Sequence, residues 1–207
     1  MKILQMEVGG LATNCYIPYN EATMEGVIVD PGAEGAAIVA AAKEHNITIK
    51  AIFITHGHND HIGGLGEVRK AFSVPVYMCQ EDAHMLANSR SVTEYGKGPV
   101  TFAPPENLFT DGQELTVAGL KFKIVTTPGH TKGGVCIIAP EDAVVFCGDT
   151  IFAESIGRTD LPGGSYEEIL HSIRSKILCL DDEVRLLPGH GPATTVGWER
   201  RRNPFLQ

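Results

Sequence analysis

Seven residues of metal-binding types lie at the ends of apolar runs, and their positions constrain the fold more than any other feature of the chain. They are His56, His58, Asp60, His61, His130, Asp149 and His190. The first four follow directly on residues 51–55, which have the pattern of a buried strand, and each of the others closes a further apolar run. Strands that end at one rim would bring these side chains together. Five imidazoles and two carboxylates are too many for one tetrahedral zinc ion, but they suit two adjacent metal ions.

The spacing within the first group divides it between two ions. His56 and His58 are two residues apart, so in an extended or turning backbone their side chains point the same way and can bind one ion. Asp60 and His61 are adjacent, point elsewhere and can bind a second ion.

The other three residues would complete and connect the two sites. His130 and His190 each close a Pro-Gly-His turn, and Asp149 can bridge two ions because a carboxylate has two oxygens. Two metal ions about 3.5–4 Å apart share a water whose pKa falls toward 7, and they polarise a substrate carbonyl. The pattern therefore predicts a hydrolase that needs no serine or cysteine nucleophile.

Strand and helix signals alternate along the chain. Strands are expected over residues 2–8, 14–19, 25–30, 50–55, 74–78, 114–117, 120–126, 134–139, 142–147 and 183–187. Helices are expected over residues 33–46, 65–72, 80–87 and 165–178, and a loop over residues 88–106. Ser165 is the expected N-cap of the last helix, with Glu168 three residues later. His45, His84 and His171 fall in helical contexts and are expected at the surface. Periodicity alone supports an α/β or an α+β chain.

Composition argues against several other classes of protein. A length of 207 residues predicts a single domain over residues 1–207. A net charge of −8, with Arg200-Arg201-Arg202 as the one basic cluster, argues against a nucleic-acid partner. No run reaches the roughly 18–20 apolar residues of a membrane helix. The first seven residues lack the pattern of a signal peptide, and the five cysteines are widely spaced, which together predict reduced thiols and a cytoplasmic location.

Five motifs, in this order, resemble those of the metallo-β-lactamase fold hydrolases. They are Val29-Asp30-Pro31-Gly32, Thr55-His56-Gly57-His58-Asn59-Asp60-His61-Ile62-Gly63-Gly64, Pro128-Gly129-His130-Thr131, Gly148-Asp149-Thr150 and Pro188-Gly189-His190-Gly191. The resemblance covers essentially the whole chain and implies an α+β fold, a four-layer αββα sandwich, that binds two divalent metal ions. It implies these ligand sets: His56, His58 and His130 for one ion; Asp60, His61 and His190 for the other; and Asp149 as the bridge.

The same resemblance implies a second role for Asp60 and a role for Asp30. Asp60 would also orient the attacking hydroxide, and Asp30 would support the ligands from behind them. Residues 157–164 and the tail Glu199 to Phe205, with Asn203-Pro204-Phe205, resemble the short bacterial glyoxalase II-like branch, the hydroxyacylglutathione hydrolases. Within residues 157–164, Arg158 is a candidate for binding a substrate carboxylate, or else for organising this glycine-rich loop.

This branch implies a thioester hydrolase that cleaves a small molecule such as S-D-lactoylglutathione by attack of metal-bound hydroxide. Only 17 residues follow His190, so the C-terminal helical domain that binds glutathione in long glyoxalase II enzymes has no counterpart here. A true β-lactamase is disfavoured, because those enzymes generally carry no bridging aspartate at the position of Asp149.

Two other activities stay open. Persulfide dioxygenases share the fold and a Gly-Arg-Thr-Asp segment, and would hold a single iron with His56, His130 and Asp149. A lactonase or another ester hydrolase is the second alternative. Zinc is the expected metal, with iron and manganese as alternatives, because these ligands accept all three. The oligomeric state is left open.

Overall fold

The chain builds one sheet and then a second, following the order of the sequence. The computed structural model describes residues 1–87 and 101–207. The strands of the first sheet are β1 (Lys2–Val8), β2 (Thr13–Asn20), β3 (Glu25–Val29), β4 (Thr48–Phe53), β5 (Val76–Cys79) and β6 (Asn107–Phe109). The strands of the second are β7 (Glu114–Val117), β8 (Leu120–Thr126), β9 (Val135–Ala139), β10 (Val144–Gly148), β13 (Arg185–Pro188) and β14 (Thr194–Thr195). A separate hairpin joins β11 (Ile151–Phe152) to β12 (Ser155–Ile156).

Helices are short and lie between or after the strands. They are α1 (Gly35–Glu44), α2 (Asn59–Ile62), α3 (Leu65–Phe72), α4 (Gln80–Ala87), α5 (Tyr166–Ser172) and α6 (Val196–Arg202). A π-helical turn, Ile173–Ile177, continues α5, and a 3-10 turn, Pro140–Asp142, precedes β10. Within the described ranges, no helix has the length and apolar character needed to cross a membrane.

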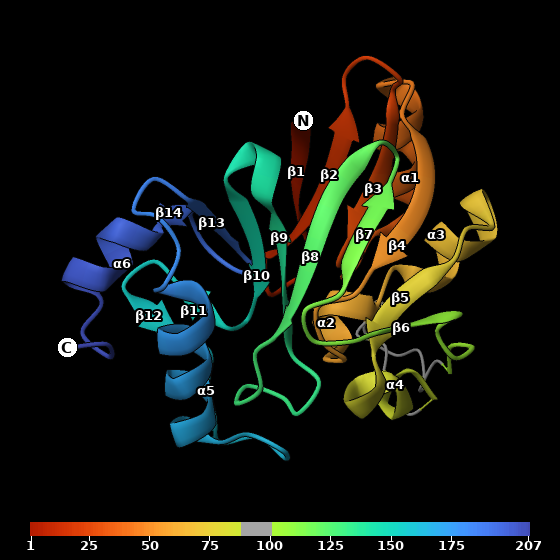
Figure 1. Ribbon diagram of the computed structural model, residues 1–207. Helices are drawn as coiled ribbons and strands as arrows, with labels where there is room; N and C mark the ends of the chain where they lie inside the picture. Colours follow the sequence, from red (N-terminus) through yellow and green to blue (C-terminus); the bar gives the residue numbers. More distant parts are fainter. Residues whose placement is uncertain (88–100) are drawn as a thin grey trace.

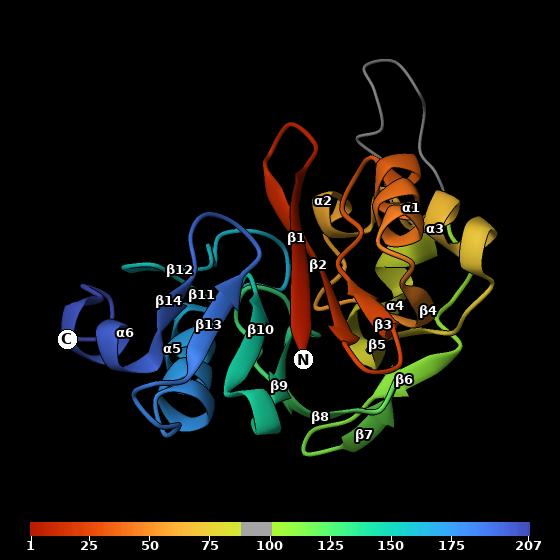
Figure 2. The ribbon, with the colours of Figure 1, turned by 90° about the horizontal axis from the view of Figure 1, so that it is seen from above.

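The two sheets pack face to face and helices cover both outer faces (Figure 1). Helices α1 and α3 pack on the outer face of the first sheet, and α5 and α6 on that of the second. Figure 2 shows the same division from above, with β1 between the two groups of helices. The molecule is therefore a four-layer αββα sandwich, and the predicted fold class is confirmed.

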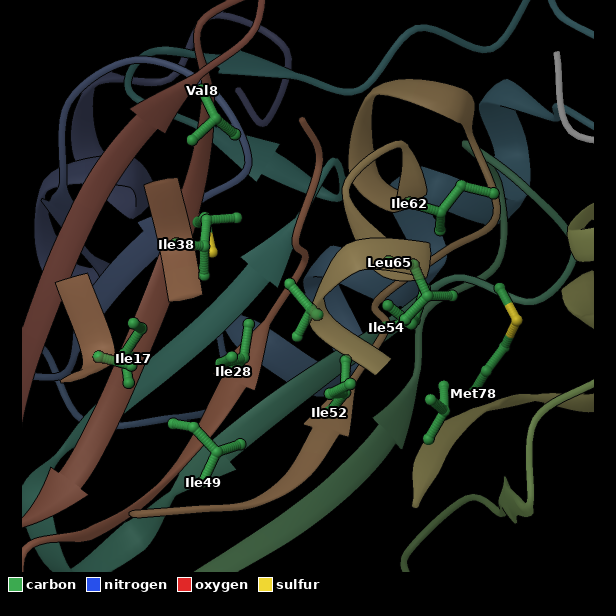
Figure 3. Packing of buried hydrophobic residues seen from close by; sticks show 14 of the residues in the cluster. Val8, Ile17, Ile28, Ile38, Ile49, Ile52, Ile54, Ile62, Leu65 and Met78 are labelled. Carbon is green, nitrogen blue, oxygen red and sulfur yellow. The ribbon is translucent and has the colours of Figure 1, made fainter. Parts of the chain in front are cut away.

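Three apolar clusters hold these layers together. One lies between the first sheet and its helices, and Figure 3 shows part of it, including Ile38, Ile52 and Leu65. A second lies between the sheets and contains Phe53, and a third lies under α5. Neighbouring residues such as Ile52 and Phe53 belong to different clusters because side chains alternate between the two faces of a strand. Each fully buried Ile or Phe side chain contributes about 1.5–3 kcal/mol.

Parallel pairing brings the ends of several strands to one rim. In the first sheet, β3, β4, β5 and β6 are parallel neighbours, and in the second β10 is parallel to β13. Parallel neighbours end at the same edge, so the loops that follow β4, β10 and β13 can meet.

The sequence-based element boundaries agree with the structure to within a few residues, and the differences concern short elements. The helix α2 lies inside the predicted histidine-rich turn, and the expected helix 165–178 is partly π-helical. The strands β6, β11, β12 and β14 and the helix α6 were absent from the prediction. The predicted loop 88–106 lies largely outside the described residues, and residues 101–106 contain neither helix nor strand.

Candidate metal centre

All seven predicted ligands meet at the rim where the strands end. Four come from the segment that follows β4: His56 and His58 from its loop, and Asp60 and His61 from α2. The other three follow strands of the second sheet: His130 follows β8, Asp149 follows β10 and His190 follows β13. The register pairs Gly148 with Pro188, which places the last two side by side.

Three groups of ligand atoms form within this cluster. The sets are His56, His58 and His130; Asp60, His61 and His190; and His56, His61 and Asp149. Within each set the ligand atoms lie within 4.8 Å of one another. The first two sets match the partition that the sequence implied, and the third places Asp149 between them. The metal-binding roles themselves stay a prediction.

Asp149 faces both sets of ligands. Its Oδ1 is 3.3 Å from His61 Nε2, and its Oδ2 is 3.4 Å from His130 Nε2. The second oxygen is also 3.6 Å from His190 Nε2. The carboxylate therefore faces both halves of the cluster, with Oδ2 near one histidine of each set and Oδ1 near His61, which is compatible with a bridging role.

Hydrogen bonds on the outside of the cluster fix the imidazole tautomers. Nδ1 of His130 lies 2.8 Å from the carbonyl oxygen of Arg158, and Nδ1 of His190 lies 3.0 Å from that of Leu11. Nδ1 of His61 lies 2.9 Å from Asp30 Oδ2. Because these oxygens only accept, each Nδ1 carries a proton, and in the neutral ring Nε2 is the atom whose lone pair faces the cluster.

His56 reaches the same arrangement through a hydroxyl. Thr55 Oγ1 donates its proton to Asp30 Oδ2 at 2.6 Å, so its contact of 3.1 Å with His56 Nδ1 uses the proton of the ring. Nε2 of His56 is then the free acceptor of this side chain.

Several buried polar atoms show that the cluster fits cations. His56 Nε2 and Asp149 Oδ1 are buried without a hydrogen-bond partner among the described residues. His58 Nδ1 lies 2.9 Å from His130 Nε2, a distance at which two lone pairs repel unless a proton or a cation lies between them. A buried polar atom without a partner costs about 1–3 kcal/mol. Nitrogen and carboxylate ligands in this number suit a pair of divalent ions.

The charges of the cluster differ between its two halves. Burial, and then the neighbouring imidazoles, lower the pKa of His56 well below its ordinary value. Burial also opposes charge on His61, but nearby carboxylates, Asp149 first, outweigh it and raise the pKa of His61 well above its ordinary value. A hydrogen bond with Asp60 raises the pKa of His190. One half therefore excludes protons, whereas the other attracts positive charge.

The carboxylates remain ionised despite their burial. Burial would raise the pKa of Asp60, but the hydrogen bond with His190 and the charge of His61 outweigh it and lower the pKa well below its ordinary value. Burial acts in the same way on Asp149, and His61 again outweighs it and lowers the pKa. Two partly buried negative charges need nearby positive charge, which His61 and His190 supply in this structure and which metal ions would supply when bound.

Asp30 occupies the place behind the ligands that the sequence implied. Its carboxylate accepts hydrogen bonds from the backbone N–H of Thr55 at 2.7 Å and from the Thr55 hydroxyl, and it contacts His61. Its φ is +50°, in the left-handed region that non-glycine residues rarely adopt. Strain of this kind persists where the surroundings over-determine the backbone, often at functional sites.

Arg158 presents its backbone to the centre and its side chain to solvent. The carbonyl orients His130, while the guanidinium makes two hydrogen bonds to Asp160, at 2.7 and 2.8 Å. Both side chains are exposed. The guanidinium therefore bonds within the glycine-rich loop 157–164, in line with the loop-organising alternative, and a contact with a substrate stays a proposal.

Other residues of the site carry no signal in the sequence. The carbonyl of Leu11, in the β1–β2 turn, orients His190 although the two residues are 179 positions apart in the sequence. Asn14 and Tyr16 of β2 both donate to the carbonyl of Pro188, in the turn before His190. The histidines expected at the surface, His45, His84 and His171, are exposed.

Comparison with known proteins places these features in a wider group. Residues 8–190 match the family model of the metallo-beta-lactamase superfamily. The hydroxyacylglutathione hydrolase GloC of Haemophilus influenzae is 34% identical over 209 residues, which cover 100% of this chain and 98% of that protein.

Two solved structures are similar over their whole length. The B3 metallo-beta-lactamase BLEG-1 is 40% identical, with a TM-score of 0.93 and 99% of each chain covered. The protein TTHA1623, solved in a di-iron-bound form, is 33% identical, with a TM-score of 0.85, and the match covers 98% of this chain and 100% of that one.

Proposed function

This chain belongs to the metallo-beta-lactamase superfamily of metallo-hydrolases, and we propose that it hydrolyses an acyl thioester such as S-D-lactoylglutathione. The observation that carries the proposal is the meeting of seven ligand side chains in two sets joined by Asp149. The similarity to a protein named hydroxyacylglutathione hydrolase supports the choice of substrate class.

The residues present would hold two divalent ions, with zinc as the proposed metal and iron or manganese as alternatives. When bound, such ions supply an acidified water as nucleophile and polarise the carbonyl of the substrate. Asp60 is proposed to orient that water, because its ionised carboxylate lies at the cluster, with Oδ2 3.1 Å from His190 Nε2 and 3.4 Å from Thr13 Oγ1. A thiol leaving group has a pKa of about 8.5, so it departs without a strong acid from the protein.

A hollow of about 300 Å³ beside the centre gives room for a small molecule. Its lining includes Met85 of α4, Lys132 of the loop after His130, and Pro162. The hollow supports a small-molecule substrate with an apolar part, and Lys132 and Glu81 place one charge of each sign on its lining. The predicted cytoplasmic location and single-domain organisation stay predictions.

The test is a panel of substrates, assayed with separate preparations of the protein that each contain a single kind of metal. The full chain loaded with zinc, iron or manganese is assayed on acyl-glutathione thioesters, lactones, β-lactams, and glutathione persulfide with an oxygen electrode. We expect thioester hydrolysis to be the fastest reaction. Absence of turnover on every thioester by protein shown to contain two ions would refute the proposal. Oxygen uptake with one iron per chain would instead identify a persulfide dioxygenase, and β-lactam turnover would align the protein with BLEG-1.

Asp60 can be tested in the same assay. Replacing it by asparagine should lower kcat by about 100-fold or more, the usual contribution of a residue that handles the proton of a nucleophile. Metal content is measured in parallel, because Asp60 is also a proposed ligand. The matched control is His171→Asn on the exposed face of α5, which should leave kcat unchanged.

A further inference from the structure

Asp82 is a buried carboxylate outside the seven-ligand cluster. It lies in the first turn of α4 and is 2% exposed. Its Oδ2 accepts a hydrogen bond from the backbone N–H of Gly57 at 3.0 Å, and its Oδ1 accepts one from the backbone N–H of Gly133 at 2.8 Å. Over residues 1–87 and 101–207, no ion pair is formed by this side chain. A buried carboxylate without a cation is costly unless hydrogen bonds compensate it, and here both oxygens are used on these two backbone groups.

The two backbone groups belong to the two loops that carry one set of ligands. Gly57 stands between His56 and His58, and Gly133 lies three residues after His130. The first loop follows β4 of one sheet, whereas the second joins β8 to β9 of the other. One carboxylate thus connects the two halves of the molecule at the set His56, His58 and His130.

Close packing supports the same connection independently of the hydrogen bonds. A Cβ added at Gly133 would collide with the backbone nitrogen and side chain of Asp82. A Cβ added at Gly57 would collide with Met85, one turn further along α4. The start of α4 therefore lies directly against both loop backbones, and neither loop has room to shift toward it.

The other set of ligands has a different support. Asp30 contacts His61 directly and reaches His56 through Thr55, whereas the hydrogen bonds of Asp82 go only to Gly57 and Gly133. Loss of Asp82 should therefore affect one half of the cluster more than the other.

We propose that Asp82 is a positioning residue that holds the loops of His56, His58 and His130 in register, so that its loss selectively weakens metal binding by that set. The inference rests on the proposed two-metal function only for the identity of the ligand, since it concerns binding rather than turnover.

The experiment is a metal titration of the full chain in competition with a chromophoric chelator, which resolves two affinities. Asp82→Asn keeps the shape of the side chain, but its amide presents a donor to one of the two N–H groups. We expect one affinity to fall about 10- to 100-fold, the usual effect of losing support behind a ligand, and the other to stay within about 3-fold. Glu81→Gln is the matched control, with the same change of charge one residue away on an exposed side chain, and should change neither affinity.

Two further backgrounds identify the affected set. In His58→Ala, Asp82→Asn should cause no additional loss of affinity for the ion that remains. In His190→Ala, it should still cause the full loss. Equal weakening of both sites, or a lower thermal midpoint with unchanged affinities, would overturn the proposal and leave Asp82 a structural residue only.

Amide hydrogen exchange of the unmodified protein adds a readout that survives a folding failure of the variant. The amides of Gly57 and Gly133 should be protected both with and without metal. Exchange at the rate of solvent-exposed amides would contradict the proposal. Failure of the thioester assay with the expected change in affinity would refute the proposed substrate but not the role of Asp82.

Discussion

At the scale of single residues, the orientation of each imidazole follows from the oxygen behind it. The outer nitrogens of His61, His130 and His190 each contact an oxygen acceptor, so the inner nitrogens already face the cluster and bind an ion once they carry no proton. Such preorganisation raises affinity because no ring has to rotate or change tautomer on binding.

Binding of metal should release protons mainly from one half of the cluster. The ordinary pKa of histidine is about 6.5. The pKa of His61 and that of His190 are raised, so in the metal-free protein these rings stay protonated to higher pH than an ordinary histidine. The pKa of His56 and that of His58 are lowered by burial first, so these rings are already neutral at pH 7. Because an ion must displace protons from its ligands, filling the site with His61 should release protons at pH 7, and the release should decline as pH rises through the raised pKa values.

Calorimetry in two buffers of different ionisation enthalpy measures this release. The variants His58→Ala and His190→Ala separate the two sites. Proton release confined to the half that contains His56 would contradict the assignment of charges.

The meeting of the seven side chains could be predicted at this scale, because each lies in a segment that follows an apolar strand and carries its signal locally. The contacts of Asp82 with Gly57 and Gly133 could not. They join segments 25 and 51 residues apart, and an aspartate in the first turn of a helix is ordinary capping chemistry in a sequence.

At the scale of elements, α5 shows how a helix stabilises a ligand loop without touching a ligand. Gly129, just before His130, has a φ of +131°, and a Cβ there would collide with the backbone of Ile169 in α5. The loop that carries His130 therefore rests on this helix. The side chain of Ser165 accepts a hydrogen bond from the N–H of Glu168 at 3.3 Å and caps the helix, as its sequence predicted.

Ser165→Ala should destabilise the protein by about 0.5–2 kcal/mol, because it removes the partner of an otherwise unpaired N–H group. Urea unfolding followed by circular dichroism measures the change. Ser175→Ala is the control: it removes a hydroxyl bonded to the preceding turn, at His171, from an exposed position. The control should change stability by less than about 0.5 kcal/mol. Equal effects of the two changes would contradict the capping role.

The elements missed by the sequence are those too short to have a period. The strands β11, β12 and β14 contain two residues each, and β6 contains three, so alternation of side chains cannot be recognised in them. The helix α6 did offer one signal, since the hydroxyl of Thr195 caps it by accepting from the N–H of Trp198.

At the scale of the whole molecule, the two sheets share one centre. Four ligands follow β4 of the first sheet, and three follow strands of the second. Ions bound there would connect the two halves of the sandwich, whereas the apolar clusters pack without contacting them. The metal-free protein should therefore remain folded but be less stable.

Removal of metal with a chelator should lower the free energy of unfolding by about 2.7 kcal/mol for each ion present at 100 times its dissociation constant. Urea unfolding with and without zinc measures the difference, and His45→Ala, at an exposed position, should not alter it. Coincident unfolding curves would show that the ions bind the two states equally or not at all.

The hydrogen bonds from β2 to the turn before His190 have a consequence for the biogenesis of the centre. Asn14 and Tyr16 donate hydrogen bonds to the carbonyl of Pro188, which lies 174 and 172 residues further along the chain. A nascent chain leaving the ribosome can fold its first sheet and expose His56 and His58 early, but it cannot position His190 until β13 has been synthesised. Contacts of such long sequence separation form slowly. The cation of the set that contains His190 is thus expected to bind only after β13 has been synthesised, and a chain that stops before this strand would hold at most one cation.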